Sequence, residues 1–190
     1  MNEFIINEIA QDLNIDIKYV ENVLKMLEEG NTIPFIARYR KEATGAMDEE
    51  KIKLIDDQYQ YQVNLAKRKD DVIRLIDEKG MLTDELKENI LKCNKLVEVE
   101  DLYRPYKEKK KTKATEAIKN GLEPLAKIIM SQPDKIDIDN VCQKYLNENV
   151  KTIEDAITGA KYIISEWISD NAFYRKWIRN YFYRNGIICS

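Results

Sequence analysis

The residues best suited to binding chemistry are the lysines and arginines of LYRPYKEKKKTK, residues 102–113. The cations of this Lys-rich loop are Arg104, Lys107, Lys109, Lys110, Lys111 and Lys113, and Glu108 is the only acidic residue among them. Clustered cations neutralise phosphates, and tyrosines can stack on unpaired bases. The loop predicts a nucleic-acid contact. A solvent-exposed charge run, or docking of the loop on an acidic surface of the same protein, remains an open alternative.

A second basic cluster is NAFYRKWIRNYFYRNG, residues 171–186, in which cations alternate with aromatic residues. Its candidate binding residues are Arg175, Lys176, Trp177 and Arg179. Such mixtures suit single-stranded nucleic acid, because bases stack and phosphates pair with arginine. They equally suit a protein interface, where tryptophan, tyrosine and arginine are enriched. Packing within the same protein is the favoured interpretation.

A third unusual stretch, IPFIARYR, combines apolar and basic residues. Thr32 as a cap and Pro34 in the first turn predict a short helix over 33–39. Its residues of interest are Pro34, Phe35, Ile36, Arg38, Tyr39 and Arg40. Apolar residues on two sides of one helix favour burial. We expect Phe35, Ile36 and Tyr39 to hold the first helices against a long one, and Arg38 or Arg40 to pair with a carboxylate.

Catalysis is disfavoured by the residue types present. The sequence has no histidine, so the commonest general base and metal ligand is missing. Cys93, Cys142 and Cys189 are far apart and show no metal-binding spacing. Adjacent acidic residues such as Asp56 and Asp57 point about 100° apart on a helix and do not converge on a metal. We expect a protein that is not an enzyme and that has no metal site and no cofactor.

The elements that position these clusters are expected to be helices. Six glycines and four prolines in 190 residues leave few turns, and 44% hydrophobic residues supply a core. The prediction is an all-α, irregular array of eight to ten helices. It begins with a helix-turn-helix-like pair over residues 2–29, which Gly30 ends, and it has a long central helix from Asp48 to about Glu78.

Capping patterns place the later helices. Thr83 predicts one helix start, and Thr152 with Asp155 predicts a capping box. Asp139 and Asp170 are further expected caps. The chain shows no apolar run of membrane-spanning length and no signal sequence, and its cysteines are unpaired. These features predict a cytoplasmic protein without membrane contact.

Three segments together resemble the N-terminal helical region of the bacterial Tex family of transcription accessory proteins. They are IPFIARYRKEATGAMDEE, EVEDLYRPYKEKKKTKATEAIKNGLEPLA and EDAITGAKYIISEWISDNAFYRKWIR. Their order and spacing agree with the family over residues 1–190. Two departures are notable. Ala46 stands where a second glycine usually follows Gly45, and the Lys-rich loop uses lysine where arginine is common.

The resemblance implies a fragment of a larger protein. In the family, an RNase-H-like domain, helix-hairpin-helix elements and an OB-fold RNA-binding domain follow the helical region, and this sequence ends before them. The implied function is a scaffold that positions those domains and contacts nucleic acid through the Lys-rich loop. Implied partners are RNA or DNA, bound by the full-length protein, and the transcription machinery. The alternative is a protein-interaction module with no nucleic-acid affinity of its own.

Overall fold

The computed structural model describes residues 2–108, 111–132 and 137–187. These residues form eleven α-helices and one short 3₁₀ helix. In the described ranges the only β-type pairing is an isolated bridge between Asn147 and Val150. The all-α prediction is confirmed, with one helix more than the upper limit expected. The chain divides into two compact units, residues 1–75 and 76–190, and the boundary falls inside a helix, where composition gives no linker signal.

The first unit contains α1 (Glu3–Leu13), α2 (Ile17–Glu28), α3 (Ile33–Tyr39) and most of α4 (Glu49–Asp77). The side chains of Asn2 and Asp16 cap α1 and α2 by accepting hydrogen bonds from Phe4 N and Lys18 N. Gly30 follows α2 with φ +89°, as its expected role at the helix end requires. The helix pair and the long helix are confirmed.

The core of this unit is aliphatic. Its fully buried side chains come from all four helices: Ile6, Ile9, Val20, Val23, Ile36, Ile52 and Ile55. The spacing of these residues on each helix gives one apolar stripe, which the neighbouring helices cover.

The turn between α3 and α4 is tight. Gly45 has φ +64° and its Cα lies against the ring of Tyr19, so an added Cβ would come within 2.8 Å of Tyr19 Cε2. The next residue, Ala46, has φ +60°. Side chains are disfavoured in this left-handed region. Ala46 thus has a backbone conformation that favours glycine, the residue that the resemblance led us to expect there.

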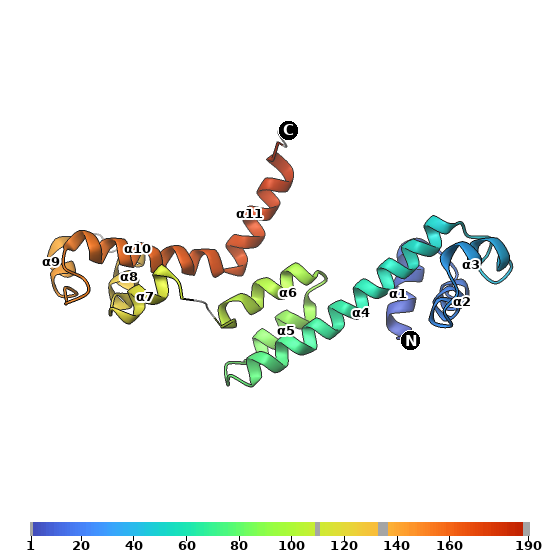
Figure 1. Cartoon of the computed structure of the whole chain (residues 1–190), viewed down its shortest axis with the longest axis horizontal. Helices are drawn as coiled ribbons and strands as arrows, with labels where there is room; N and C mark the ends of the chain where they lie inside the picture. Colours follow the sequence, from blue (N-terminus) through green and yellow to red (C-terminus); the bar gives the residue numbers. More distant parts are fainter. Residues whose placement is uncertain (1, 109–110, 133–136, 188–190) are drawn as a thin grey trace. The chain divides into compact units, whose positions relative to one another are not determined.

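The second unit begins at Ile76, just before the last residue of α4, and contains all the later helices (Figure 1). Its helices are α5 (Asp84–Lys92), α6 (Leu96–Tyr103), the 3₁₀ helix η1 (Arg104–Tyr106), α7 (Lys113–Lys119), α8 (Glu123–Met130), α9 (Ile138–Gln143), α10 (Ile153–Asp170) and α11 (Ala172–Asn185). Pro105 lies in η1, where it ends the α-helical hydrogen bonding of α6.

Helix α10 is the axis of the larger core in this unit, with α7, α8 and α9 packed beside it (Figure 1). Leu122, Leu125, Cys142, Ala156, Ala160 and Ile163 are buried there. Gly159 lets α10 approach closely, because an added Cβ would lie 2.3 Å from Leu122 Cδ1. Burial raises the pKa of the Cys142 thiol, and the charge of Asp139 adds to the effect.

Two predicted caps are wrong, and a third residue, Thr32, occupies the N-cap position of α3 without a side-chain hydrogen bond. Asp137, not Asp139, caps α9 by accepting a hydrogen bond from Asn140 N. Asn171, not Asp170, caps α11, since its side chain accepts from Phe173 N and Tyr174 N. At the starts of α9 and α11, two nearby polar residues could each accept the capping hydrogen bond. The capping box of Thr152 and Asp155 and the Thr83 cap are confirmed.

Candidate nucleic-acid interface

The first two cations of the Lys-rich loop are paired within the protein. Arg104 Nε lies 2.7 Å from Asp170 Oδ1 at the end of α10. Lys107 Nζ lies 2.5 Å from Glu100 Oε2 on α6. Both pairs fix η1 against its neighbours, so these two side chains are less available to phosphates than the sequence predicts.

Further along the loop the pairing is weaker. Lys111 Nζ is 3.9 Å from Glu116 Oε1, and its side chain is 79% exposed. Lys113 Nζ lies 5.0 Å from the centre of the Tyr162 ring. Exposed pairs at such distances contribute little to stability, so both lysines can exchange partners readily. Lys109 and Lys110, predicted in the same cluster, lie outside the described residues.

The cations of α11 converge on Asp101 of α6. Arg175 Nε is 2.6 Å from Asp101 Oδ1, and Arg179 donates to Asp101 Oδ2. Arg175 Nη1 also donates to the carbonyl of Ser169 at 3.2 Å. One carboxylate, only 5% exposed, thus receives two guanidinium groups spaced one helical turn apart.

A third ion pair extends this contact. Lys176 Nζ lies 3.0 Å from Glu98 Oε1, one turn before Asp101 on α6. The hydrogen bond from Lys176 holds the pKa of Glu98 below its usual value despite partial burial. Burial is the largest single influence on Asp101 and raises its pKa. The hydrogen bonds from Arg179 and Arg175 together outweigh that influence, so the pKa of Asp101 is lowered. Both carboxylates are held ionised.

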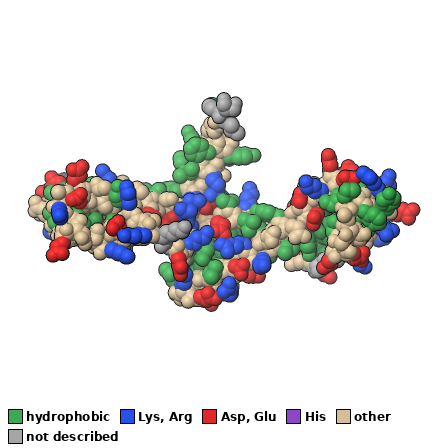
Figure 2. All heavy atoms as spheres, in the orientation of Figure 1, with side chains coloured by type: hydrophobic (Ala, Val, Ile, Leu, Met, Phe, Trp, Pro, Cys, Tyr) green, Lys and Arg blue, Asp and Glu red, His purple; other side chains and the backbone are tan. Residues whose placement is uncertain are grey.

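The aromatic half of α11 faces solvent. Within the described residues no side chain of α11 is buried, and hydrophobic side chains project from this helix (Figure 2). Phe173 is 71% exposed and Trp177 is 58% exposed. Trp177 and Tyr181 stack, with ring centres 5.6 Å apart and planes 19° apart. The basic and aromatic residues of α11 therefore have different surroundings. The cations contact α6, which agrees with packing inside the protein, and the aromatic residues remain exposed to solvent.

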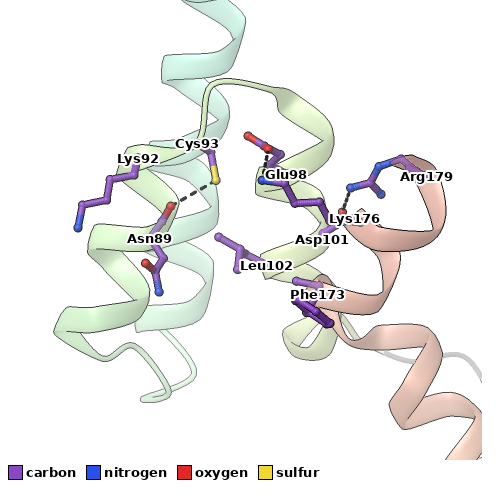
Figure 3. A pocket seen from close by; sticks show the side chains of 10 residues that line it. Asn89, Lys92, Cys93, Glu98, Asp101, Leu102, Phe173, Lys176 and Arg179 are labelled. Carbon is purple, nitrogen blue, oxygen red and sulfur yellow. Dashed lines mark hydrogen bonds and ion pairs between the residues drawn. The ribbon is translucent and has the colours of Figure 1, made fainter. Parts of the chain in front are cut away.

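A pocket of about 300 Å³ lies where α5, α6 and α11 meet (Figure 3). Cys93 and Leu102 point into it, Phe173 closes its lower edge, and Lys176 reaches across to Glu98. The Cys93 thiol contacts the carbonyl of Asn89 at 3.3 Å. The lining is chiefly apolar, which suits an apolar side chain better than a sugar or a phosphate.

The IPFIARY segment forms α3, as predicted, and Ile36 is fully buried. Its two aromatic residues differ from the expectation: Phe35 is 37% exposed and Tyr39 is 69% exposed. They contact each other, with ring centres 5.3 Å apart, and Arg40 lies over Phe35. A seven-residue helix turns only one narrow side to the core, and Ile33, Ile36 and Ala37 fill it. Arg38 Nη2 lies 3.7 Å from Glu49 Oε1, an exposed ion pair that is too long for the charge-assisted hydrogen bond expected from the sequence.

The carboxylates that organise the interface were not recognised in the sequence. Glu98 and Asp101 are three residues apart and share one side of α6, a spacing that could have indicated a partner for the arginines at 175 and 179. Across the described residues no cluster of three or more acidic or cysteine side chains could hold a metal ion. None of the helices in these ranges has the length and apolar character needed to cross a membrane.

Comparison with known proteins gives consistent matches. Residues 3–77 match the family described as Tex-like protein N-terminal domain. The chain is 52% identical over 185 residues to the uncharacterized protein YdcI of Bacillus subtilis, covering 96% of this chain and 26% of that protein. It is 37% identical over 164 residues to the transcriptional accessory protein Tex of Neisseria gonorrhoeae, covering 86% of this chain and 22% of that protein.

A human relative is also similar. The S1 RNA-binding domain-containing protein 1 is 28% identical over 184 residues, covering 95% of this chain and 18% of that protein. The chain thus spans about a quarter or less of the length of these relatives.

Proposed function

Because the chain belongs to the Tex family, we propose that it is the N-terminal scaffold of a nucleic-acid-binding transcription accessory factor. In this proposal it positions the other domains of a longer protein and contacts RNA or DNA through the Lys-rich loop. One relative's name refers to transcription and another's to RNA binding, which supports partners of that kind. A cytoplasmic location is part of the same proposal. The absence of histidine from the sequence supports a role without catalysis.

The exposed, weakly paired lysines of the loop are the observation that carries the nucleic-acid contact. Lys111 and Lys113 have only loose partners, whereas Arg104 and Lys107 are committed to Asp170 and Glu100. The proposed phosphate contacts are therefore made by the lysines at 109, 110, 111 and 113. Four phosphate contacts to a single strand would give a slope of about −3 in log affinity against log salt concentration.

Fluorescence anisotropy tests this contact. Labelled single-stranded RNA, single-stranded DNA and duplex DNA are titrated with the 190-residue chain at several salt concentrations. Changing Lys109, Lys110 and Lys111 to alanine should weaken binding and reduce the slope on single strands by about 2. The matched control changes Lys51, Lys53 and Lys67, three exposed lysines of α4, and should leave the slope unchanged. The proposal would be contradicted if the loop variant and the control variant lost nucleic-acid affinity equally, or if the unchanged chain bound no nucleic acid at low salt.

The exposed aromatic residues of α11 favour a second candidate function, a protein-interaction module. Uncovered aromatic residues of this size are typical of binding surfaces for proteins. Such binding would persist at salt concentrations that abolish phosphate contacts. A chain that binds no nucleic acid at low salt but retains a protein ligand at high salt would favour this second function.

A further inference from the structure

The pocket between α5, α6 and α11 has an apolar interior open to solvent (Figure 3). Cys93, Leu102, Ala172 and Phe173 supply its carbon and sulfur surface. Its volume of about 300 Å³ can hold one or two aliphatic side chains. Phe173 lines the pocket and is nevertheless 71% exposed, so the structure leaves apolar surface at its mouth that a ligand could bury.

The charges around the pocket are unevenly exposed. Lys92 and Lys176 have side chains 72% and 63% exposed, whereas those of Glu98 and Asp101 are 25% and 5% exposed. Three cations, Lys92, Lys176 and Arg179, line the pocket against two carboxylates, Glu98 and Asp101, so the lining carries a net charge of +1. Lys92 pairs with Glu88 and Lys176 with Glu98, so it is this small positive excess that favours an anionic ligand over a cationic one.

The apolar surface continues from the pocket along α11. Phe173, Trp177 and Tyr181 follow one another at four-residue steps, and their rings lie on one side of the helix. Side chains spaced by four residues form a ridge, and such a ridge packs against the groove of another helix. A pocket for one side chain together with a ridge along the wall is the arrangement used in helix-in-groove recognition.

We propose that this surface binds an acidic amphipathic α-helix of a partner protein. An aliphatic side chain of the partner enters the pocket beside Leu102 and Phe173, and further apolar residues cover Trp177 and Tyr181. Acidic residues flanking this apolar stripe pair with Lys92, whose partner Glu88 is 69% exposed and easily exchanged, and with the exposed ammonium of Lys176, which keeps its bond to the half-buried Glu98. This inference rests on the second candidate function, the protein-interaction module, for which it names the kind of partner, and it does not depend on nucleic-acid binding by the Lys-rich loop.

Nucleic acid fits the same surface less well. A base needs donors and acceptors at its edges, but both carboxylates of the lining, Asp101 and Glu98, already form ion pairs, which leaves Asn89 as the amide side chain that could contact a base edge. The interior offers apolar surface instead, which a leucine or methionine fills without leaving polar atoms unsatisfied.

The test uses a synthetic peptide of about four helical turns composed of leucine, glutamate and alanine, with leucines at helical spacing and glutamates beside them. The 190-residue chain is titrated with this peptide, and NMR signals are followed for Cys93, Leu102, Phe173 and the Trp177 indole. The Trp167 indole, packed in the other core of this unit, serves as an internal reference. A peptide with lysine in place of glutamate, a scrambled peptide and oligouridylate are the comparison ligands.

The acidic peptide should shift the four signals saturably and leave Trp167 unchanged. Phe173→Ala and Lys92→Glu should each weaken binding by about five-fold or more. Matched controls on the same helices, Tyr183→Ala and Lys87→Glu, should change it by less than about two-fold, because neither residue lines the pocket.

Three outcomes would overturn the proposal: no shift with the acidic peptide, equal binding of the lysine and scrambled peptides, or saturable shifts of the same signals by oligouridylate. The last outcome would assign the surface to nucleic acid. Alanine at 109, 110 and 111 should not alter peptide binding. Failure of the Lys-rich loop to bind nucleic acid can therefore be told apart from failure of the surface to bind the peptide.

Discussion

The attachment of α11 should depend on a single carboxylate. Asp101 receives hydrogen bonds from Arg175 and Arg179, and no side chain of α11 is buried among the described residues. Little apolar burial is therefore available to hold the helix if the carboxylate is removed. Asp101→Asn keeps the size of the side chain but removes the charge that both guanidinium groups require.

The loss of docking free energy in Asp101→Asn depends on how far water can reach the two arginines that Asp101 binds. Removing one member of a buried ion pair costs about 3–5 kcal/mol, because a charge is left without a partner. Arg175 and Arg179 are 31% and 35% exposed, so water can partly solvate them in the variant. We therefore expect a loss of about 2 kcal/mol for the docking of α11, which corresponds to an increase of about 30-fold in its opening equilibrium.

Hydrogen–deuterium exchange followed by mass spectrometry measures this loss locally. In Asp101→Asn, amides of α11 should exchange about 30-fold faster, while amides in the middle of α10 keep their protection. Glu88→Gln is the control, because its pair with Lys92 is exposed on both sides and should contribute less than about 1 kcal/mol. The reasoning is refuted if α11 exchanges as in the unchanged protein, or if α10 loses protection to the same degree.

Three further changes have expected outcomes. The pKa values of Asp101 and Glu98 are lowered in the folded state, so their contribution to α11 docking should be fully present above about pH 5 and be lost as the pH falls below about 4. Exchange rates of α11 amides, corrected for their intrinsic pH dependence, should show no loss of protection between about pH 6 and 8. Ala46→Gly should raise the free energy of unfolding by about 0.5–1 kcal/mol in urea titrations by relieving the left-handed backbone, whereas Ala66→Gly within α4 should lower it by about 1 kcal/mol. Gly159→Val should lower it by at least about 2 kcal/mol by overpacking against Leu122, and Leu122→Ala should then cost less in that variant than in the unchanged protein, a coupling that a double-mutant cycle measures.

Local signals explain most of what the sequence predicted correctly. Caps such as Thr83 and the Thr152–Asp155 box act within three residues, and the left-handed conformation of Gly30 needs no distant partner. The all-α fold and the long helix α4 follow from such signals and from the apolar spacing. The two wrong caps show the limit of this reasoning, since neighbouring polar residues offer the same hydrogen bond.

Contacts between distant residues could not be predicted in the same way. Arg175 and Asp101 are 74 residues apart, and although the spacing of Glu98 and Asp101 could have indicated a cationic partner, it does not identify Arg175 as that partner. Likewise, the exposure of Phe35 and Tyr39 depends on how narrow a side of α3 the core of the first unit covers. The sequence showed a basic and aromatic cluster in α11, but only the position of α6 decides which half of it forms contacts within the protein.

The same ion pairs determine how variants of the Lys-rich loop must be interpreted. Arg104 belongs to the loop by sequence, but its guanidinium is bonded to Asp170, the last residue of α10, and Asn171 then caps α11. An Arg104→Ala variant would therefore loosen the junction of α10 and α11 as well as remove a cation. Weaker nucleic-acid binding by that variant would not identify a phosphate contact. Lys111 has only a distant partner, so its substitution removes charge without disturbing the fold, and the loop is best tested there.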